Sequence, residues 1–139
     1  MQVQFVAGFG PITQDAGAAG AFWADALGIP FQEPAPGYFR NDSFSGVGSF
    51  ARWPLSQAAE ATFGSPDWPV DLPVPQAWLE LDVASAQAVA DAVAELRAAG
   101  HEVLVDAHEE PWGQTTARIQ SPEGVLVGIT YTPWMHREP

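Results

Sequence analysis

The chain has 139 residues, a length that fits one domain and buries roughly two thirds of the unfolded surface. It carries 17 acidic and 5 basic residues, for a net charge of −12, and it has no cysteine. The charge disfavours nucleic acid and anionic membranes as partners, and the lack of cysteine excludes disulfides, thiolate metal sites and a cysteine nucleophile.

The hydrophobic fraction is 47%, and six tryptophans are spread along the chain. No apolar run approaches the roughly 18 residues that a membrane span needs, so a soluble protein with an aromatic-rich core or pocket is predicted. The first ten residues, MQVQFVAGFG, lack the basic region and small-residue cleavage site of a secretion signal. A cytoplasmic location is therefore expected.

The first half of the chain reads as a strand, a helix and further strands. An apolar segment over 4–12 predicts a strand, and Asp15 can cap a helix that ends near Leu27. The larger apolar side chains of this helix share a face, so Phe22 and Trp23 are assigned to the core. Two strand-like stretches follow, at 36–42 and 46–53.

A connecting arm is predicted over 54–75, because this stretch carries five prolines and no sustained hydrophobic period. The second half then repeats the order of the first. A strand over 77–83 alternates Trp78, Glu80 and Asp82 with apolar residues, and Ser85 can cap a helix that ends at Gly100. Further strands are predicted at 101–106, 115–120 and 125–131.

Each half is thus a strand, a helix and two or three strands, which indicates a duplicated βαβββ unit. The predicted fold is α+β, with two modules that share a core because neither buries its sheet alone. One domain, 1–139, is expected to consist of a module at 1–53, the arm at 54–75, a module at 76–133 and a short tail at 134–139.

Two stretches, ITQDAGAAGAFWADALGI and PWGQTTARIQSPEGVLVGI, together with the duplication, resemble the vicinal oxygen chelate superfamily. That superfamily includes glyoxalase I, bleomycin resistance proteins and extradiol dioxygenases. The resemblance covers nearly the whole chain and implies a curved mixed sheet around a cleft. It also implies a homodimer, with the cleft shared between two chains.

In metal-dependent members, four inward strand positions supply His, Gln or Glu ligands to one divalent ion. The resemblance places these positions at Gly8, Phe50, Trp78 and Gly128, and none of these side chains can bind a metal. No metal and no cofactor are therefore expected. Gly128 interrupts an otherwise strong strand, and we interpret it as a former ligand position cleared to leave room in a cavity.

Two further groups of residues could take part in metal binding or acid–base chemistry. Asp106, His108 and Glu110 alternate, so they could form a metal or acid–base set, but Pro111 ends the extended run and a solvated edge is favoured. Glu80 on the Trp78 face could be a general base or the partner of a cationic ligand. It could equally be a structural carboxylate paired with Arg118 or Arg52.

The sequence is best explained by a metal-independent binding protein similar to bleomycin resistance proteins, which provide antibiotic resistance by sequestering a drug. The expected ligand is an aromatic, cationic small molecule. Stacking is assigned to Phe50, Trp78 and Trp112, contact with the positive group to Glu80, and orientation of a carbonyl or carboxylate to Arg52 or Arg118; Leu126 and Gly128 complete the predicted site.

Two alternatives remain open at this level. One is an enzyme of the lyase, isomerase or dioxygenase kind, with a misplaced metal site or with metal-free proton transfer by Glu80. The other is a structural or regulatory subunit whose cleft is filled by its own side chains. An open aromatic cleft would favour the binding protein.

Overall fold

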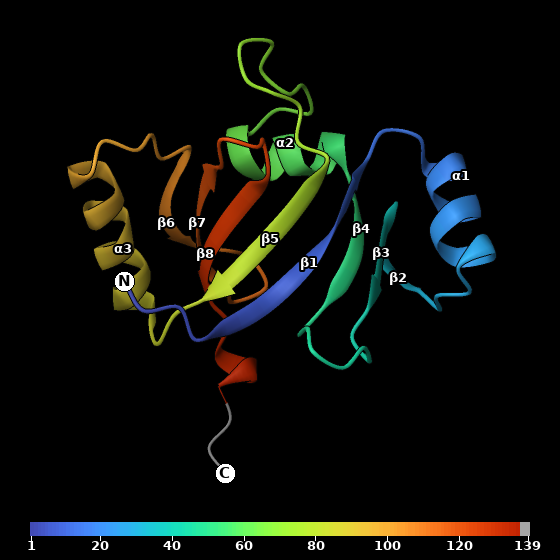
Figure 1. Cartoon of the computed structure of the whole chain (residues 1–139), viewed down its shortest axis with the longest axis horizontal. Coiled ribbons are helices and arrows are strands. Elements are labelled where there is room, and N and C mark those ends of the chain that lie inside the picture. The colour runs from blue at the N-terminus through green and yellow to red at the C-terminus, as the bar shows by residue number, and fades with distance from the viewer. Residues whose placement is uncertain (137–139) are drawn as a thin grey trace.

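A single mixed sheet, in the order β2-β3-β4-β1-β5-β8-β7-β6, runs through the computed structural model, which describes residues 1–136 (Figure 1). The strands are β1 (Phe5–Thr13), β2 (Gln32–Ala35), β3 (Tyr38–Asn41), β4 (Phe50–Pro54), β5 (Ala77–Asp82), β6 (Val105–Glu109), β7 (Thr115–Gln120) and β8 (Leu126–Tyr131). The helices are α1 (Ala16–Ala19), the π-helical η1 (Gly20–Ala26), α2 (Leu55–Phe63), α3 (Ala86–Ala98) and the 3₁₀ turn η2 (Pro133–Met135).

The curved sheet joins two βαβββ modules, with α1 and α3 at its opposite ends and α2 across its upper rim (Figure 1). The predicted α+β fold is therefore confirmed. No helix within residues 1–136 is long and apolar enough to cross a membrane.

The two modules are related by an approximate two-fold axis between β1 and β5, which pair antiparallel with Phe9 opposite Leu79. In one module Phe9 pairs with Phe50 across the parallel β1–β4 ladder, and in the other Leu79 pairs with Val127 across the parallel β5–β8 ladder. Phe50 therefore corresponds to Val127, and the next residue of β4, Ala51, corresponds to Gly128. This correspondence decides which side chains face the cleft.

The helix of the second module, α3, forms as predicted. Ser85 Oγ accepts a hydrogen bond from the Ala88 amide at 3.1 Å, and Gly100 ends the helix with a φ of 88°. Its apolar face packs on β6, β7 and β8 in a core that contains Val83, Val89, Ala92, Val93, Ala117 and Ile129.

The helix of the first module differs from the prediction. Asp15 caps it as expected, accepting from the Ala18 amide at 2.9 Å, but after one turn the helix widens and the Leu27 amide bonds to the Phe22 carbonyl. In a π turn the hydrogen bonds join residues five apart rather than four, so the side chains do not share the face predicted for an α-helix. The assignment of Phe22 to the core is wrong, since it is 54% exposed, whereas Trp23 is partly buried against Phe50.

The predicted arm contains an unexpected helix, α2. Its buried face consists of Ala58, Ala59 and Thr62, and Gly64 ends it with a φ of 74°. Leu55, Ala58, Ala59 and Thr62 follow the spacing of one helix face. The prolines on either side of this stretch obscured that pattern in the sequence. α2 closes a second core on the other face of the sheet, made of Ile12, Ala51, Ala58, Trp78 and Leu126.

Two strands also depart from the prediction. The strand expected at 101–106 lies at Val105–Glu109 instead, because the His101 amide is still engaged in capping α3 and donates to the Leu96 carbonyl. The short edge strand β2 was not predicted at all. Its residues are exposed, so it has no hydrophobic pattern to reveal it.

Candidate functional site

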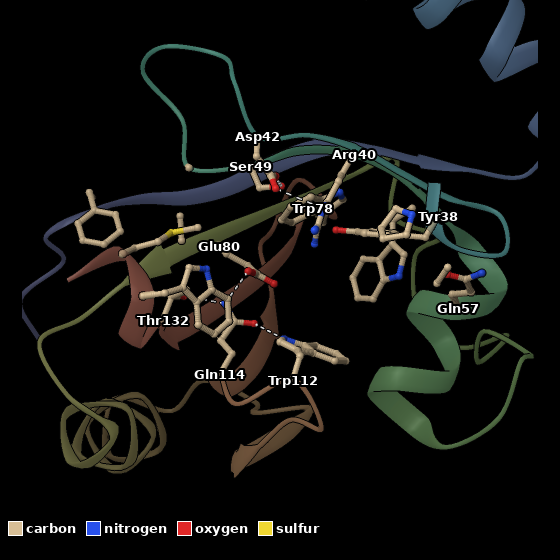
Figure 2. A pocket seen from close by; sticks show the side chains of 18 of the residues that line it. Tyr38, Arg40, Asp42, Ser49, Gln57, Trp78, Glu80, Trp112, Gln114 and Thr132 are labelled. Carbon is tan, nitrogen blue, oxygen red and sulfur yellow. Dashed lines mark hydrogen bonds and ion pairs between the residues drawn. The ribbon is translucent and has the colours of Figure 1, made fainter. Parts of the chain in front are cut away.

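A cavity of about 820 Å³ lies on the face of the sheet that points away from α3. Figure 2 shows Tyr38 and Arg40 reaching into it from one side, with Glu80, Gln114 and Trp112 on the other. Its aromatic lining consists of Phe5, Tyr38, Trp53, Trp78, Trp112 and Trp134. Its polar lining consists of Arg40, Asp42, Ser49, Gln57, Glu80, Gln114, Arg118 and Thr132. Its size and mixed lining are typical of small-molecule sites.

Four of the predicted site residues, Trp78, Glu80, Trp112 and Arg118, line this cavity together. Leu126 lies beneath it in the core with Trp78 rather than at its surface.

The placement of Phe50 and Arg52 in the cleft is wrong. The Phe50 ring lies on the helix side of the sheet, 5.7 Å from the Trp23 ring, and the Arg52 guanidinium lies 4.1 Å from the centre of the Phe39 ring. They correspond to Val127 and its neighbour Ile129, which also face a helix. The inward residue of β4 is Ala51, so the sequence count was off by one.

The space that a side chain at Gly8 would fill is occupied by the Trp78 ring. A Cβ atom at Gly8 would lie 2.5 Å from Cζ3 of the Trp78 ring. Trp78 is only 5% exposed and packs in the core, so its ring is at once the floor of the cavity and part of the core.

A proline in β1 explains how the Trp78 indole is anchored. The Phe9 amide donates to the carbonyl of Ser49, the residue before β4. The parallel ladder assigns the next donor position to residue 11 and its acceptor to the Ala51 carbonyl. Pro11 has no N–H to donate. The Trp78 Nε1–H takes that place and donates to the Ala51 oxygen at 3.1 Å.

Gly128 is filled in the same way, by Glu80. The two residues are direct neighbours across β5 and β8, and a Cβ atom at Gly128 would lie 3.0 Å from Glu80 Cγ. The interpretation of Gly128 as a position cleared for a ligand is therefore corrected: it makes room for a side chain of the same chain.

The positions that the resemblance assigns to a metal do not fit one. With Ala51 in place of Phe50, they are Gly8, Ala51, Trp78 and Gly128, and none of these side chains carries an imidazole or carboxylate donor. Within residues 1–136, no cluster of three or more His, Asp or Glu side chains is arranged to hold a metal ion.

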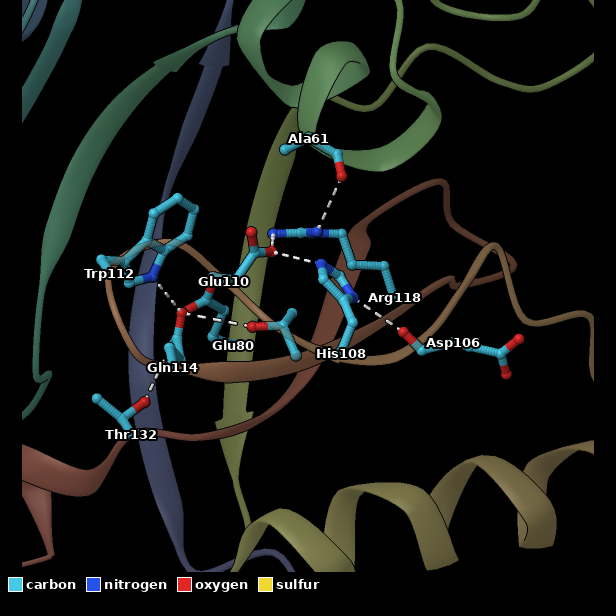
Figure 3. A network of polar contacts seen from close by, with 10 residues as sticks. Ala61, Glu80, Asp106, His108, Glu110, Trp112, Gln114, Arg118 and Thr132 are labelled. Atoms are coloured by element: carbon cyan, nitrogen blue, oxygen red, sulfur yellow. Dashed lines mark hydrogen bonds and ion pairs between the residues drawn. The ribbon is translucent and has the colours of Figure 1, made fainter.

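Asp106, His108 and Glu110 do not converge on one point (Figure 3). Asp106 turns to α3, where its Oδ1 lies 2.6 Å from Arg97 Nη1, and the hydrogen bond from Arg97 lowers the pKa of Asp106. Glu110 is instead buried, and its Oε1 accepts from Arg118 Nη2 at 2.9 Å and lies 3.2 Å from His108 Nε2. The solvated-edge interpretation therefore holds for Asp106 and fails for Glu110.

Glu80 is held by a chain of hydrogen bonds that starts at the cavity mouth (Figure 3). Trp112 Nε1 donates to Gln114 Oε1 at 3.0 Å, which directs Gln114 Nε2 to Glu80 Oε1 at 3.0 Å and to Thr132 Oγ1 at 2.8 Å. Burial raises the pKa of the Glu80 carboxyl, against the opposing effects of the nearby Arg118 guanidinium and of the Gln114 hydrogen bond.

Neither structural pairing considered for Glu80 is present. Arg118 is 2% exposed and gives its hydrogen bonds to Glu110 and, at 3.3 Å, to the Ala61 carbonyl. Arg52 lies on the other face of the sheet.

Sequence reasoning missed Tyr38 and Arg40. Arg40 pairs with Ala51 across β3 and β4, as Arg118 pairs with Gly128 across β7 and β8, so the two arginines are equivalent. Aligning the duplicated halves from their closing strands could have revealed it. Burial raises the pKa of the neighbouring Tyr38 hydroxyl to about 12, with a smaller contribution from the charge of Glu80.

A buried aspartate ties the C-terminal segment to the sheet, which the sequence did not reveal either. Asp82 Oδ1 accepts from the hydroxyls of Thr130 and Thr132 at 2.6 and 2.8 Å, and Oδ2 accepts from the Thr132 amide and contacts His136 Nε2. This attachment places Trp134 and η2 at one end of the cavity.

The fold and this site place the chain in a known family. A family model for a glyoxalase-like domain matches residues 8–130. The chain belongs to the glyoxalase-like family, within the vicinal oxygen chelate superfamily.

Solved structures share its fold. A glyoxalase/bleomycin resistance protein/dioxygenase superfamily member from Vibrio splendidus 12B01 is 16% identical with a TM-score of 0.60, over 94% of this chain and 100% of that one. Methylmalonyl-CoA epimerase of Streptomyces coelicolor, in complex with 2-nitronate-propionyl-CoA, is 15% identical with a TM-score of 0.53, over 95% and 99%. The 2,2′,3-trihydroxybiphenyl 1,2-dioxygenase of Sphingomonas wittichii is 16% identical with a TM-score of 0.54, over 91% and 42%.

At these identities the likeness concerns the fold alone. A comparison with curated proteins gave no match.

Proposed function

We propose that this chain is a metal-independent small-molecule-binding protein, similar in role to the drug-sequestering bleomycin resistance proteins. The observation that carries the proposal is the aromatic cavity of about 820 Å³, whose floor is made by Trp78 and Glu80 in the space beside Gly8 and Gly128. The space of a metal centre is thus occupied by the protein's own side chains, while the volume beside it stays open.

The aromatic walls favour a ligand with a planar ring system. Trp53, Trp112 and Trp134 surround the cavity above the Trp78 floor, and flat surfaces of this kind suit offset or edge-on stacking. The remaining volume also argues against the alternative of a structural subunit whose cleft is filled by its own side chains.

Binding is tested by titrating chelator-treated protein with planar aromatic compounds and following tryptophan fluorescence and heat. We expect saturable binding that added zinc, nickel, manganese or ferrous iron leaves unchanged. Trp112→Ala should weaken it by roughly fivefold to tenfold, because one stacked ring is lost. Phe22→Ala is the matched control, since both rings are 54% exposed and Phe22 lies outside the cavity. Binding that appears only after a metal is added would contradict the proposal.

A second candidate, metal-free proton transfer, is supported by Glu80. One of its oxygens accepts from Gln114, and the carboxyl lines the cavity with a raised pKa, a condition that suits a general acid or base. The test is deuterium exchange at carbon acids next to a carbonyl group, followed by NMR. Exchange that Glu80→Gln abolishes would favour the enzyme, and its absence with bound ligand would favour the binding protein.

A homodimer that shares the cleft mouth remains part of this proposal, as does a cytoplasmic location. Support for the dimer comes from two exposed tryptophans of the cavity lining, Trp112 and Trp134. Sedimentation velocity at micromolar concentration tests it, and a monomer would remove the shared-cleft arrangement.

A further inference from the structure

The charged groups that line the cavity are not equally neutralised. Arg40 Nε lies 3.2 Å from Asp42 Oδ2, and Arg118 is paired at 2.9 Å with Glu110. Glu80, in contrast, has no ion-pair partner within residues 1–136 and accepts only an amide hydrogen bond from Gln114. Each lining arginine therefore has its own carboxylate, and one carboxyl group is left over.

The free oxygen of this carboxyl group is fixed in direction. Gln114 binds Glu80 Oε1, while Oε2 has no hydrogen-bond partner among the described residues and borders the cavity (Figure 2). Gln114 itself is held by hydrogen bonds with Trp112 and Thr132, and the Glu80 side chain fills the space in which a side chain at Gly128 would lie. A preorganised acceptor of this kind binds a donor with little loss of side-chain freedom.

The surroundings of Glu80 favour a cation. The rings of Trp53, Trp78 and Trp112 border the same cavity, and aromatic faces attract ammonium groups. The net charge of −12 on the chain also draws cations towards it.

On the basis of the proposed binding function, we propose that the ligand carries a protonated amine next to its planar ring system, and that this amine pairs with the free oxygen of Glu80. The ring system lies against the tryptophans, and the ammonium group supplies the charge that the cavity lacks.

Proton release should accompany this binding. Burial raises the pKa of Glu80, so the empty cavity favours the protonated carboxyl, whereas an adjacent ammonium favours the carboxylate. The other charged or titratable groups around Glu80 are Arg118 and Glu110, which neutralise each other, together with Asp82 and Tyr38. Affinity for an amine should therefore rise with pH while Glu80 titrates.

The experiment compares three compounds with one ring system, naphthylethylamine, naphthylethanol and naphthylacetate, by calorimetry on metal-free protein. We expect the amine to bind at least about tenfold more tightly than the alcohol, because a charge-assisted hydrogen bond replaces a neutral one. Titrations in two buffers of different protonation enthalpy should show net proton release with the amine only.

Glu80→Gln should remove both the preference for the amine and the proton release. Glu109→Gln is the matched control, because it removes the same charge from an exposed position outside the cavity lining. Equal binding of amine and alcohol would overturn the ammonium assignment and leave the binding function intact. Tightest binding of naphthylacetate would overturn it in favour of Arg40. Failure of all three compounds to bind would count against the binding function as well.

Discussion

The two halves of the sheet have the same strand order and register but treat equivalent positions differently. Arg118 in the C-terminal half is 2% exposed and neutralised by buried Glu110, whereas the side chain of its counterpart, Arg40, is 42% exposed and faces Asp42 at the surface. The duplicated backbone thus places two arginine side chains at equivalent positions. The C-terminal half buries its arginine in an ion pair, whereas the N-terminal half pairs its arginine with a carboxylate at the surface.

The same contrast holds for the inward glycine positions and for the helices. Trp78 and Gly8 occupy equivalent positions in the two halves. The Trp78 ring fills the space beside Gly8, so a side chain at residue 8 would clash with it. α3 is a regular helix over a continuous core, while the helix of the first half widens into a π turn and exposes Phe22. The helix of the C-terminal half therefore covers a continuous core, whereas the helix of the N-terminal half leaves a large apolar side chain exposed.

The largest effect is expected from Trp78→Ala, which should lower the free energy of unfolding by about 3–5 kcal/mol. The ring is a core member, and its removal also leaves the Ala51 carbonyl without its donor. Urea denaturation measures the loss. Trp112→Ala, an exposed ring of the same cavity, is the control and should cost less than about 1 kcal/mol. Similar losses in both variants would show that Trp78 is wall rather than core.

A comparable effect should separate the two arginines. Glu110→Ala leaves Arg118 buried without its partner and should cost about 3–5 kcal/mol. Asp42→Ala removes the partner of the exposed Arg40 and should cost only about 0–1 kcal/mol. Chemical denaturation of both variants at moderate salt checks the difference. Equal costs would mean that Arg40 and Arg118 depend on their carboxylate partners to the same extent.

A smaller effect is expected when the two inward glycines are replaced. Gly8→Ala would place its Cβ 2.5 Å from a rigid ring and should cost about 1–3 kcal/mol. Gly128→Ala meets the flexible Glu80 chain at 3.0 Å, and the lower entropy of the unfolded chain partly offsets the contact, so a cost of about 1 kcal/mol or less is expected. Thermal denaturation of both proteins gives the order, and the reverse order would contradict the assignment of the Trp78 ring to the space beside Gly8.

The smallest effect concerns pH. The folded chain holds the proton of Glu80 more tightly than the unfolded chain, whose pKa is near 4.5, so stability should fall as pH rises from about 4.5 until the folded carboxyl has also titrated. Glu80→Gln should flatten this fall, and Glu109→Gln should not. Midpoints of urea denaturation between pH 4 and pH 8 measure the slopes. The same slope in wild type and Glu80→Gln would show that burial does not raise this pKa.

The sequence predicted elements whose signals are local. Ser85 and Asp15 cap helices where expected. The alternation along β5 is confirmed, since Trp78 and Glu80 line the cavity and Asp82 is buried. The sequence-based prediction was wrong where an element depends on its packing against distant segments of the chain. The helix α2 was hidden among prolines, and the inward face of β4 was assigned one residue too early.

What the sequence by itself determined is the duplicated α+β fold, because period, caps and residue type are carried by the chain locally. Only the tertiary structure decided which side chains share the cavity. Arg40 and Glu80 lie in different modules, and Trp78 lies beside Gly8 because Pro11 leaves a carbonyl free for the indole. Side chains far apart in the chain meet through register, and a shift of one residue reverses the face that each of them occupies.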